Sequence, residues 1–348
     1  MKNIIKGLAI LLLSNVVLGQ ATNLPDISVI GNFLGTSSTD SNSFDVKEIE
    51  FSYQHYLYPG VKVNIFTALH KEDSGARDFH LEESYVDFAN LTELFFENSP
   101  EILHFGSSIG KKYLAIGKVN LFHPEQWDFI DRSYPSQYVL GGDENLSAEG
   151  GQLTYLLPLP FFSQIELGYW SANNSSHDES QEHSSIEYTN RFLTSRLWNG
   201  FELNENNEIE IGISNLIGNV GANEDQQQSL TAIDLTYQSE HKNNKFKLSS
   251  EVYFANYGED NEAPETQDGY FVSTSYTFNQ AIETGLRYGQ LGKHGDEGST
   301  KTQWSYMLGK QLTETSKFKI QYNTGENIEN TLLAQFIFGM GPHAHVLQ

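Results

Sequence analysis

Segments of about ten residues in which polar and apolar side chains alternate recur along the second half of this chain. Clear examples are residues 229–240, 245–259, 270–279, 281–292 and 302–312. In the first of them Ile233, Leu235 and Tyr237 share one side. Alternation with a period of two is typical of a β-strand with one apolar face. Strands of soluble sandwiches are usually shorter, so the pattern favours a transmembrane β-barrel.

The same pattern, followed back to the N-terminus, predicts an all-β, antiparallel barrel of about sixteen strands (about 14–18). The strands are expected near residues 26–35, 45–57, 61–69, 81–91, 101–117, 147–157, 161–171, 189–203, 207–218, 229–240, 245–258, 269–279, 281–292, 302–312, 316–324 and 330–340. Short links rich in Pro, Gly and Asn alternate with long polar links. Outer-membrane barrels have short periplasmic turns and long external loops, which matches this asymmetry.

A sheet that spans a membrane must close into a barrel, because the surrounding hydrocarbon offers no hydrogen bonds to an edge strand. An unpaired backbone amide in hydrocarbon costs several kcal/mol, so an open edge strand cannot face lipid. A closed ring of about sixteen strands is too wide for wall side chains alone to fill its centre. The sequence therefore predicts a water-filled lumen unless a segment folds inward.

The N-terminus has the three parts of a secretory signal. Lys2 and Lys6 precede the apolar run 8–18, and the small residues Gly19 and Ala21 follow. This pattern predicts a signal peptide at residues 1–21 and a barrel at 22–348, in the outer membrane of a Gram-negative bacterium. A buried N-terminal helix is the alternative. The partners expected for such a chain are outer-membrane lipid and the barrel-assembly machinery.

Composition excludes several other classes. No segment after the leader has about eighteen continuous apolar residues, so we expect no transmembrane helix. The chain has no cysteine, which excludes disulfides and thiolate chemistry. Its 18 Tyr and 22 Phe suit the aromatic girdles of a barrel. A formal charge of -24 makes nucleic acid an improbable partner.

Four stretches resemble a family of proteobacterial outer-membrane proteins described as porin-like or as zinc-regulated outer-membrane receptors. They are PDISVIGNFLG at 25–35, AIGKVNLFHPEQWDFIDRSYP at 115–135, SAEGGQLTYLLPLPFF at 147–162 and FGMGPHAH at 338–345. The resemblance implies an outer-membrane barrel connected with zinc supply, and some members are labelled TonB-dependent. The residues after the signal peptide are too few for a plug and a barrel of about twenty-two strands. We therefore expect a barrel without a TonB plug.

The link 118–146, which follows the fifth expected strand, is too apolar for a loop that meets only water. General porins fold the loop at this place into the barrel, and we expect the same here, with aromatic rings buried and charged side chains facing the pore. The candidate constriction residues are His123, Glu125, Trp127, Asp128, Asp131 and Arg132. A packed external cap is the alternative.

Strand parity predicts which charges line the lumen. If Ile165 and Leu167 face lipid, Glu166 faces inward, and the same reasoning applies along the other strands. The predicted lumen charges are Glu166, Arg196, Glu210, Asp234, Glu251 and Arg287. A slip of one residue in register would invert any of these assignments. Acids outnumber bases, which predicts a mild preference for cations.

Two predicted external loops contain imidazoles beside carboxylates, the ligand types that suit Zn²⁺. The first holds His177, Asp178, Glu182 and His183, and the second holds His70 and His80. Plain solvated loops are the alternative for both. We expect weak Zn²⁺ binding at most and no other cofactor. No serine–histidine pairing is indicated, so an enzyme is not expected.

Together these features predict a porin-like channel for passive passage of small hydrophilic solutes, with a link to zinc uptake that the resemblance implies. Two alternatives stay open: a ligand-binding or zinc-binding receptor without a plug, and a surface adhesin with a plugged lumen. Assembly as a homo-oligomer is compatible with all three of these functions.

Overall fold

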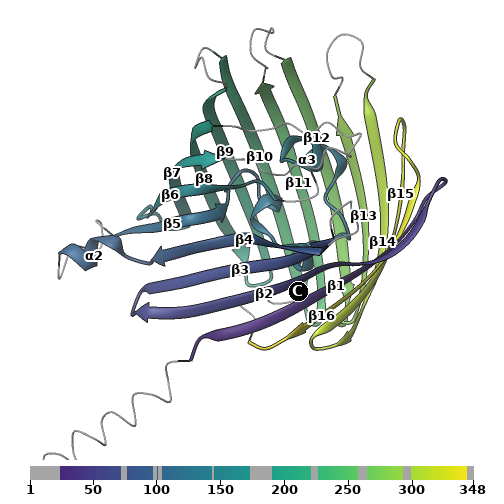
Figure 1. The fold of residues 1–348 in the computed structure, drawn as a ribbon, viewed down its shortest axis with the longest axis horizontal. Coiled ribbons are helices and arrows are strands. Elements are labelled where there is room, and N and C mark those ends of the chain that lie inside the picture. Colours follow the sequence, from purple (N-terminus) through teal and green to yellow (C-terminus); the bar gives the residue numbers. More distant parts are fainter. Residues whose placement is uncertain are drawn as a thin grey trace, which may run out of the picture.

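The computed structural model confirms the predicted closed antiparallel barrel (Figure 1). It describes residues 24–71, 77–96, 100, 104–142, 145–172, 190–220, 226–257, 265–292 and 299–342. These residues form sixteen strands: β1 (Asp26–Ser37), β2 (Asn42–Tyr58), β3 (Val61–Lys71), β4 (Arg77–Phe88), β5 (Phe105–Tyr113), β6 (Ser147–Leu156), β7 (Phe162–Ala172), β8 (Asn190–Asn204), β9 (Asn207–Val220), β10 (Gln226–His241), β11 (Asn244–Tyr257), β12 (Glu265–Phe278), β13 (Ile282–Leu291), β14 (Lys301–Thr313), β15 (Ser316–Thr324) and β16 (Thr331–Met340). Each strand pairs with its sequence neighbours, and β1 closes the ring on β16 from Val29↔Met340 to Ser37↔Leu332.

Tight turns join the strands at one end, where the sequence predicts short links. Gly60 between β2 and β3 has φ 78°, and Lys242 and Asn279 have φ 57° and 47°. Glycine and asparagine adopt this left-handed region at low cost, which explains why Gly60 and Asn279 occupy such turns. The link after β4 is longer and contains a short helix, α2 (Leu91–Phe95), whose first amides are capped by the Asn90 side chain.

The wall separates an apolar outside from a mixed inside, as strand alternation requires. On β10, Ile233 and Leu235 are exposed on the outer face, whereas Leu230, Ala232 and Asp234 are buried on the inner face. Exposed Leu, Ile, Phe and Tyr side chains on other strands continue this outer surface. In hydrocarbon such a surface faces lipid tails. Separately, among the described residues no helix is long and apolar enough to cross a membrane.

One irregularity in the wall changes which side chains enter the lumen. The β3–β4 register shifts between Phe66 and Thr67, which pair with Glu83 and Leu81. Glu82 is therefore the extra residue of a β-bulge. The bulge allows the adjacent side chains of Glu82 and Glu83 both to be buried, which regular alternation would forbid.

The main apolar cluster lies inside the ring. Helix α3 (Tyr134–Val139) contributes Tyr134, Tyr138 and Val139 to it, and the wall contributes buried residues from β6 to β13, among them Trp170 and Tyr253. Figure 1 shows α3 lying against the inner side of the wall near β11, β12 and β13, the strands that it contacts. A segment between β5 and β6 thus fills part of the lumen.

Candidate functional site: a loop inside the barrel

The chain leaves the wall after Tyr113 and returns to it at Ser147. The sequence predicts a strand to residue 117, but β5 ends earlier because residues 114–117 already turn inward. The segment between the two strands contains two short 3₁₀ turns, η2 (Val119–Leu121) and η3 (Pro124–Gln126), and α3. We call residues 118–146 the lumen loop. The structure places its described residues, 118–142 and 145–146, within the barrel and not over its outer mouth.

On one side the lumen loop is attached to acidic strands. His123 Nδ1 lies 2.7 Å from Glu50 Oε2 on β2, and His123 Nε2 lies 3.1 Å from Glu83 Oε2 on β4. The imidazole is only 1% exposed. Burial disfavours its charged form, but the Glu50 and Glu83 carboxylates outweigh burial and raise the pKa of His123 well above its usual value.

This attachment continues along the wall as a chain of hydrogen bonds. The Tyr113 amide donates to Glu83 Oε1 at 2.8 Å, and the Tyr113 hydroxyl donates to Glu82 Oε2 at 2.7 Å. Glu82 Oε1 is 2.9 Å from His70 Nε2, and the His70 ring meets the edge of the His80 ring. The residue where β5 ends therefore links the lumen loop to the end of the β3–β4 hairpin.

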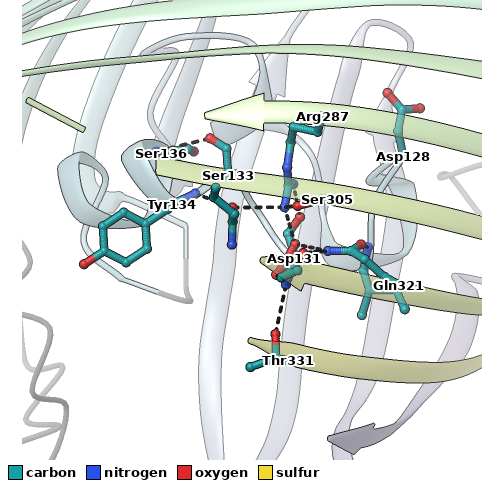
Figure 2. A network of polar contacts seen from close by, with 12 residues as sticks. Asp128, Asp131, Ser133, Tyr134, Ser136, Arg287, Ser305, Gln321 and Thr331 are labelled. Atoms are coloured by element: carbon teal, nitrogen blue, oxygen red, sulfur yellow. Dashed lines mark hydrogen bonds and ion pairs between the residues drawn. The ribbon is translucent and has the colours of Figure 1, made fainter. Parts of the chain in front are cut away.

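At a second part of the wall the lumen loop is attached to β13 and β15. Arg287 donates to Asp131 Oδ1 at 2.5 Å, and the same carboxylate accepts from Gln321 at 2.6 Å and from Asn323 at 2.8 Å. Figure 2 shows Asp131 at the centre of this network, with Arg287 and Gln321 pointing toward it. The loop backbone also contributes to this network: the Ile130 amide donates to Gln321 at 2.7 Å.

Two lysines extend this second attachment. Lys247 on β11 lies 2.8 Å from Asp128 Oδ2, and Lys319 on β15 donates to the carbonyls of Trp127 at 2.5 Å and Asp128 at 2.9 Å. Burial raises the pKa of the Asp128 carboxyl, but the Lys247 ammonium outweighs burial and holds it below its usual value. On this side the wall supplies cations and the loop supplies oxygen atoms.

A third attachment fixes the start of the lumen loop. The amides of Lys118 and Val119 donate to Glu251 Oε1 at 2.8 and 2.7 Å, and Lys118 Nζ lies 2.7 Å from Glu210 Oε2. Gly117 has φ 65°, and a Cβ there would lie 2.3 Å from Glu251 Oε2. A side chain at residue 117 would therefore obstruct this contact. Arg196 also donates to the Gly117 carbonyl, at 3.1 Å.

All six predicted constriction residues lie in the lumen, but two of the four charges predicted to face the pore are buried instead. Glu125 is only 4% exposed against the β2 side, and Arg132 is 2% exposed and donates to the Gly142 carbonyl. The expectation that these two charges face the pore is therefore wrong. Arg132 contacts the loop itself, and Glu125 lies beside Glu50 of β2. His123 and Trp127 are buried too.

The six predicted lumen charges all point inward. Buried among them are Arg196, Asp234, Glu251 and Arg287; Glu166 and Glu210 are partly exposed. Arg196 pairs with Asp234 at 2.8 Å, so part of the lumen charge is neutralised internally. The cluster His177, Asp178, Glu182 and His183 lies outside the described residues. The expectation that His70 and His80 lie in an external loop is wrong, because they lie on the paired ends of β3 and β4, where their rings meet edge to face.

Strand parity alone cannot place both Glu82 and Glu83, two glutamates near His123, inside the lumen. Glu82 and Glu83 are adjacent, so alternation assigns them to opposite faces, and the bulge in β4 brings both inward. Two consecutive glutamates within a strand are the available signal, because one of them would otherwise face lipid at high cost. Glu48, two residues before Glu50, is buried on the same inner face.

A cavity open to solvent lies between the lumen loop and the β10–β13 wall. Its lining includes Phe122, Trp127, Asp128, Lys247 and Arg287. The cavity therefore combines aromatic faces with charged groups of both signs. This is the type of surface that a hydrated solute meets in a selective pore.

No family model matches the chain, and no curated protein matches it. Solved structures do match. The trimer form of in-vitro folded OmpT of Vibrio cholerae aligns with a TM-score of 0.58 at 10% identity, covering 91% of this chain and 99% of that one. OmpF of Salmonella typhi, in a complex with daunomycin, gives 0.57 at 11%, covering 91% and 98%. The outer-membrane channel DcaP of Acinetobacter baumannii gives 0.58 at 12%, also covering 91% and 98%.

These likenesses extend over nearly the whole barrel, and at this identity they show the fold. The chain has the sixteen-stranded fold of Gram-negative outer-membrane porins. With its apolar outer surface, this agrees with the predicted location in the outer membrane.

Proposed function

We propose that the protein is an outer-membrane channel for passive diffusion of small hydrophilic solutes, and that the lumen loop sets the width of the pore. The observation that most supports this is the attachment of the loop to separate parts of the wall, through His123 at β2 and β4, through Asp131 at β13 and β15, and through its first amides at Glu251 of β11. A segment fixed in this way narrows the lumen and leaves the strand wall intact. Selection then follows from the size and charge of the remaining passage.

A mild preference for cations is part of the proposal. Of the six lumen charges discussed above, four are acids, and only Asp234 among these acids pairs with one of the two arginines. Glu210 is offset by Lys118 of the loop. Because the wall bases Lys247 and Arg287 are already paired with loop carboxylates, the remaining field is negative but weak.

Planar-bilayer recording on the purified, refolded chain tests both parts. The expected result is discrete steps of current, with a reversal potential in a KCl gradient that indicates modest cation selectivity. A barrel that folds but stays silent would contradict the channel and favour a receptor or an adhesin with a plugged lumen. An anion-selective channel would contradict only the charge argument.

A receptor is the second candidate, and the apolar packing of α3 favours it. Tyr134, Tyr138 and Val139 are buried against the wall, which leaves less lumen than a loop lying flat would. A protein of this kind would bind its ligand in the cavity lined by Phe122 and Trp127. Tryptophan fluorescence during titration with solutes distinguishes the two, because passive diffusion needs no saturable binding.

We also propose weak Zn²⁺ capture at the external loops, as the resemblance to zinc-regulated receptors implies. His177 and His183, helped by His70 and His80, would supply two or three ligands, with water completing the shell. Titrating Zn²⁺ into the wild type and into a His177→Ala, His183→Ala variant tests this. Weaker binding by the variant is expected, and equal binding would mean that the loop is solvated surface.

Assembly as a homo-oligomer is proposed on the likeness to the trimer form of OmpT. Light scattering of the detergent-solubilised protein, with the detergent mass subtracted, measures the number of chains. A trimer or another closed oligomer is expected, and a monomer at all concentrations would contradict this part.

A further inference from the structure

A compact group of metal-ligand side chains lies where the lumen loop meets β2. Glu50, His123 and Glu125 each present one ligand atom, and these atoms lie within 4.8 Å of one another. All three residues are more than nine-tenths buried. They come from sequence positions far apart, and only the inward fold of the loop brings them together.

Glu125 gives the independent sign that a ligand belongs here. Within the described part of the chain, its Oε1 atom is buried and accepts no hydrogen bond. A buried carboxylate oxygen without a donor is costly, because it has lost water and gained no partner. Since Glu125 lies beside Glu50 and His123, a cation bound to those groups would supply the missing partner.

The surrounding charge favours the same conclusion. Glu48, Glu82 and Glu83 are also buried on these strands, so five glutamates gather around two imidazoles, His70 and His123. The five carboxyl groups lie together inside the barrel and outnumber the two imidazoles. A divalent cation would reduce the excess where the acids converge.

We infer that Glu50, His123 and Glu125 form a binding site for a first-row divalent cation such as Zn²⁺, which would clamp the lumen loop to the wall. The ligands would be Nδ1 of His123 and one oxygen from each carboxylate, and nitrogen with carboxylate oxygen is a donor set that Zn²⁺ accepts. This site is separate from the external loops and does not depend on whether the barrel conducts.

The atoms around the site are arranged as metal-binding histidines require. A ligating imidazole usually donates its other N–H to a carboxylate, which fixes the ring. His123 Nε2 lies 3.1 Å from Glu83, and Glu83 is held in turn by the Tyr113 amide. Ligands at about 2.1 Å from one ion are at most about 4.2 Å apart, so only a small contraction of the group is needed.

The test is metal retention by the full chain. The parent protein is the full chain with His177→Ala and His183→Ala, which lacks these two imidazoles of the external loop. It is refolded in Zn²⁺, passed over a desalting column and assayed for metal per chain. Glu125→Gln removes one ligand charge without removing a hydrogen bond that Oε1 makes. Glu283→Gln is the control, because Glu283 is similarly buried but pairs with Lys317, away from the site.

A single equivalent of Zn²⁺ is expected in the parent and in Glu283→Gln, with affinity at least about tenfold lower in Glu125→Gln. Refolding with Co²⁺ should give a visible absorption band that Glu125→Gln alters. His123→Asn provides a second variant should Glu125→Gln not fold, and the expected loss is the same. Equal retention by parent and site variants, or none by the parent, would overturn the inference, whatever the bilayer recordings show.

Discussion

Two of the three attachments of the lumen loop, those at His123 and at Asp131, use opposite charge arrangements. At β2 and β4 the wall is acidic, and the loop supplies the imidazole of His123. At β11, β13 and β15 the wall is basic, and the loop supplies carboxylates and carbonyls around Asp128 and Asp131. A loop turned end for end would place like charges in contact. The charge reversal therefore specifies the direction in which the loop crosses the lumen.

The two attachments also differ in exposure. The carboxylates Glu50 and Glu83 of the acidic attachment are 3% and 6% exposed, whereas Asp128 and Asp131 of the basic attachment are 25% and 18% exposed. Losing one partner of a buried pair costs more than losing one that water can replace. The acidic attachment should therefore be the stronger determinant of stability, and the basic attachment the more responsive to salt and pH.

The largest expected effect comes from His123→Ala. This change leaves the buried Glu50 and Glu83 without their shared partner, and we expect a loss of about 3–5 kcal/mol in the free energy of unfolding. Urea unfolding in detergent micelles, with chelator present, measures it. His241→Ala, at the exposed end of β10, is the matched control and should stay within about 0.5 kcal/mol. A loss of similar size in both variants would mean that the acidic attachment has no special weight.

Arg287→Ala should have a smaller effect on the other side. It removes one partner of Asp131, but that carboxylate still accepts from Gln321 and Asn323 and is partly exposed. We expect a loss of about 1–3 kcal/mol, together with higher single-channel conductance as the loop loosens. Arg191→Ala, on an exposed arginine of β8, should change neither quantity. A cost larger than that of His123→Ala would reverse the ranking of the two attachments.

The smallest expected effect is a pH dependence at Asp128. The pKa of its carboxyl is lowered in the folded protein, so the pairing with Lys247 contributes fully above the ordinary pKa of about 3.9. This contribution is lost as pH falls through the lowered folded value. Stability measured from pH 7 down to pH 3 should therefore decline less steeply in Asp128→Asn than in wild type. Parallel curves would show that Lys247 does not stabilise the charged carboxylate.

The sequence predicts features that depend on neighbouring residues better than it predicts contacts between residues far apart in the chain. Alternation defines the strands well because it is local, and most predicted bounds lie close to those observed. The inward fold of residues 118–146 is also predicted, from their apolar content. The partners of His123 are not, because Glu50 is 73 residues away and the bulge at Glu82 changes which side chains of β4 enter the lumen. Bulges and long-range pairings depend on the assembled ring, which no local pattern encodes.

The central claim is that the channel conducts with the lumen loop in place. The chain has no cysteine, so a Pro135→Cys, Gly269→Cys pair would be its only thiols. A Cβ at Gly269 would lie 2.8 Å from that of Pro135, which is shorter than the usual Cβ separation of about 3.5–4.5 Å in a disulfide, so the two residues must move apart by about 1 Å to reach bonding geometry. With that movement oxidation should form the bond in the folded barrel, and single-channel conductance of the cross-linked protein should equal that of wild type. Failure to cross-link in a folded barrel, or a cross-linked protein that no longer conducts, would contradict the account.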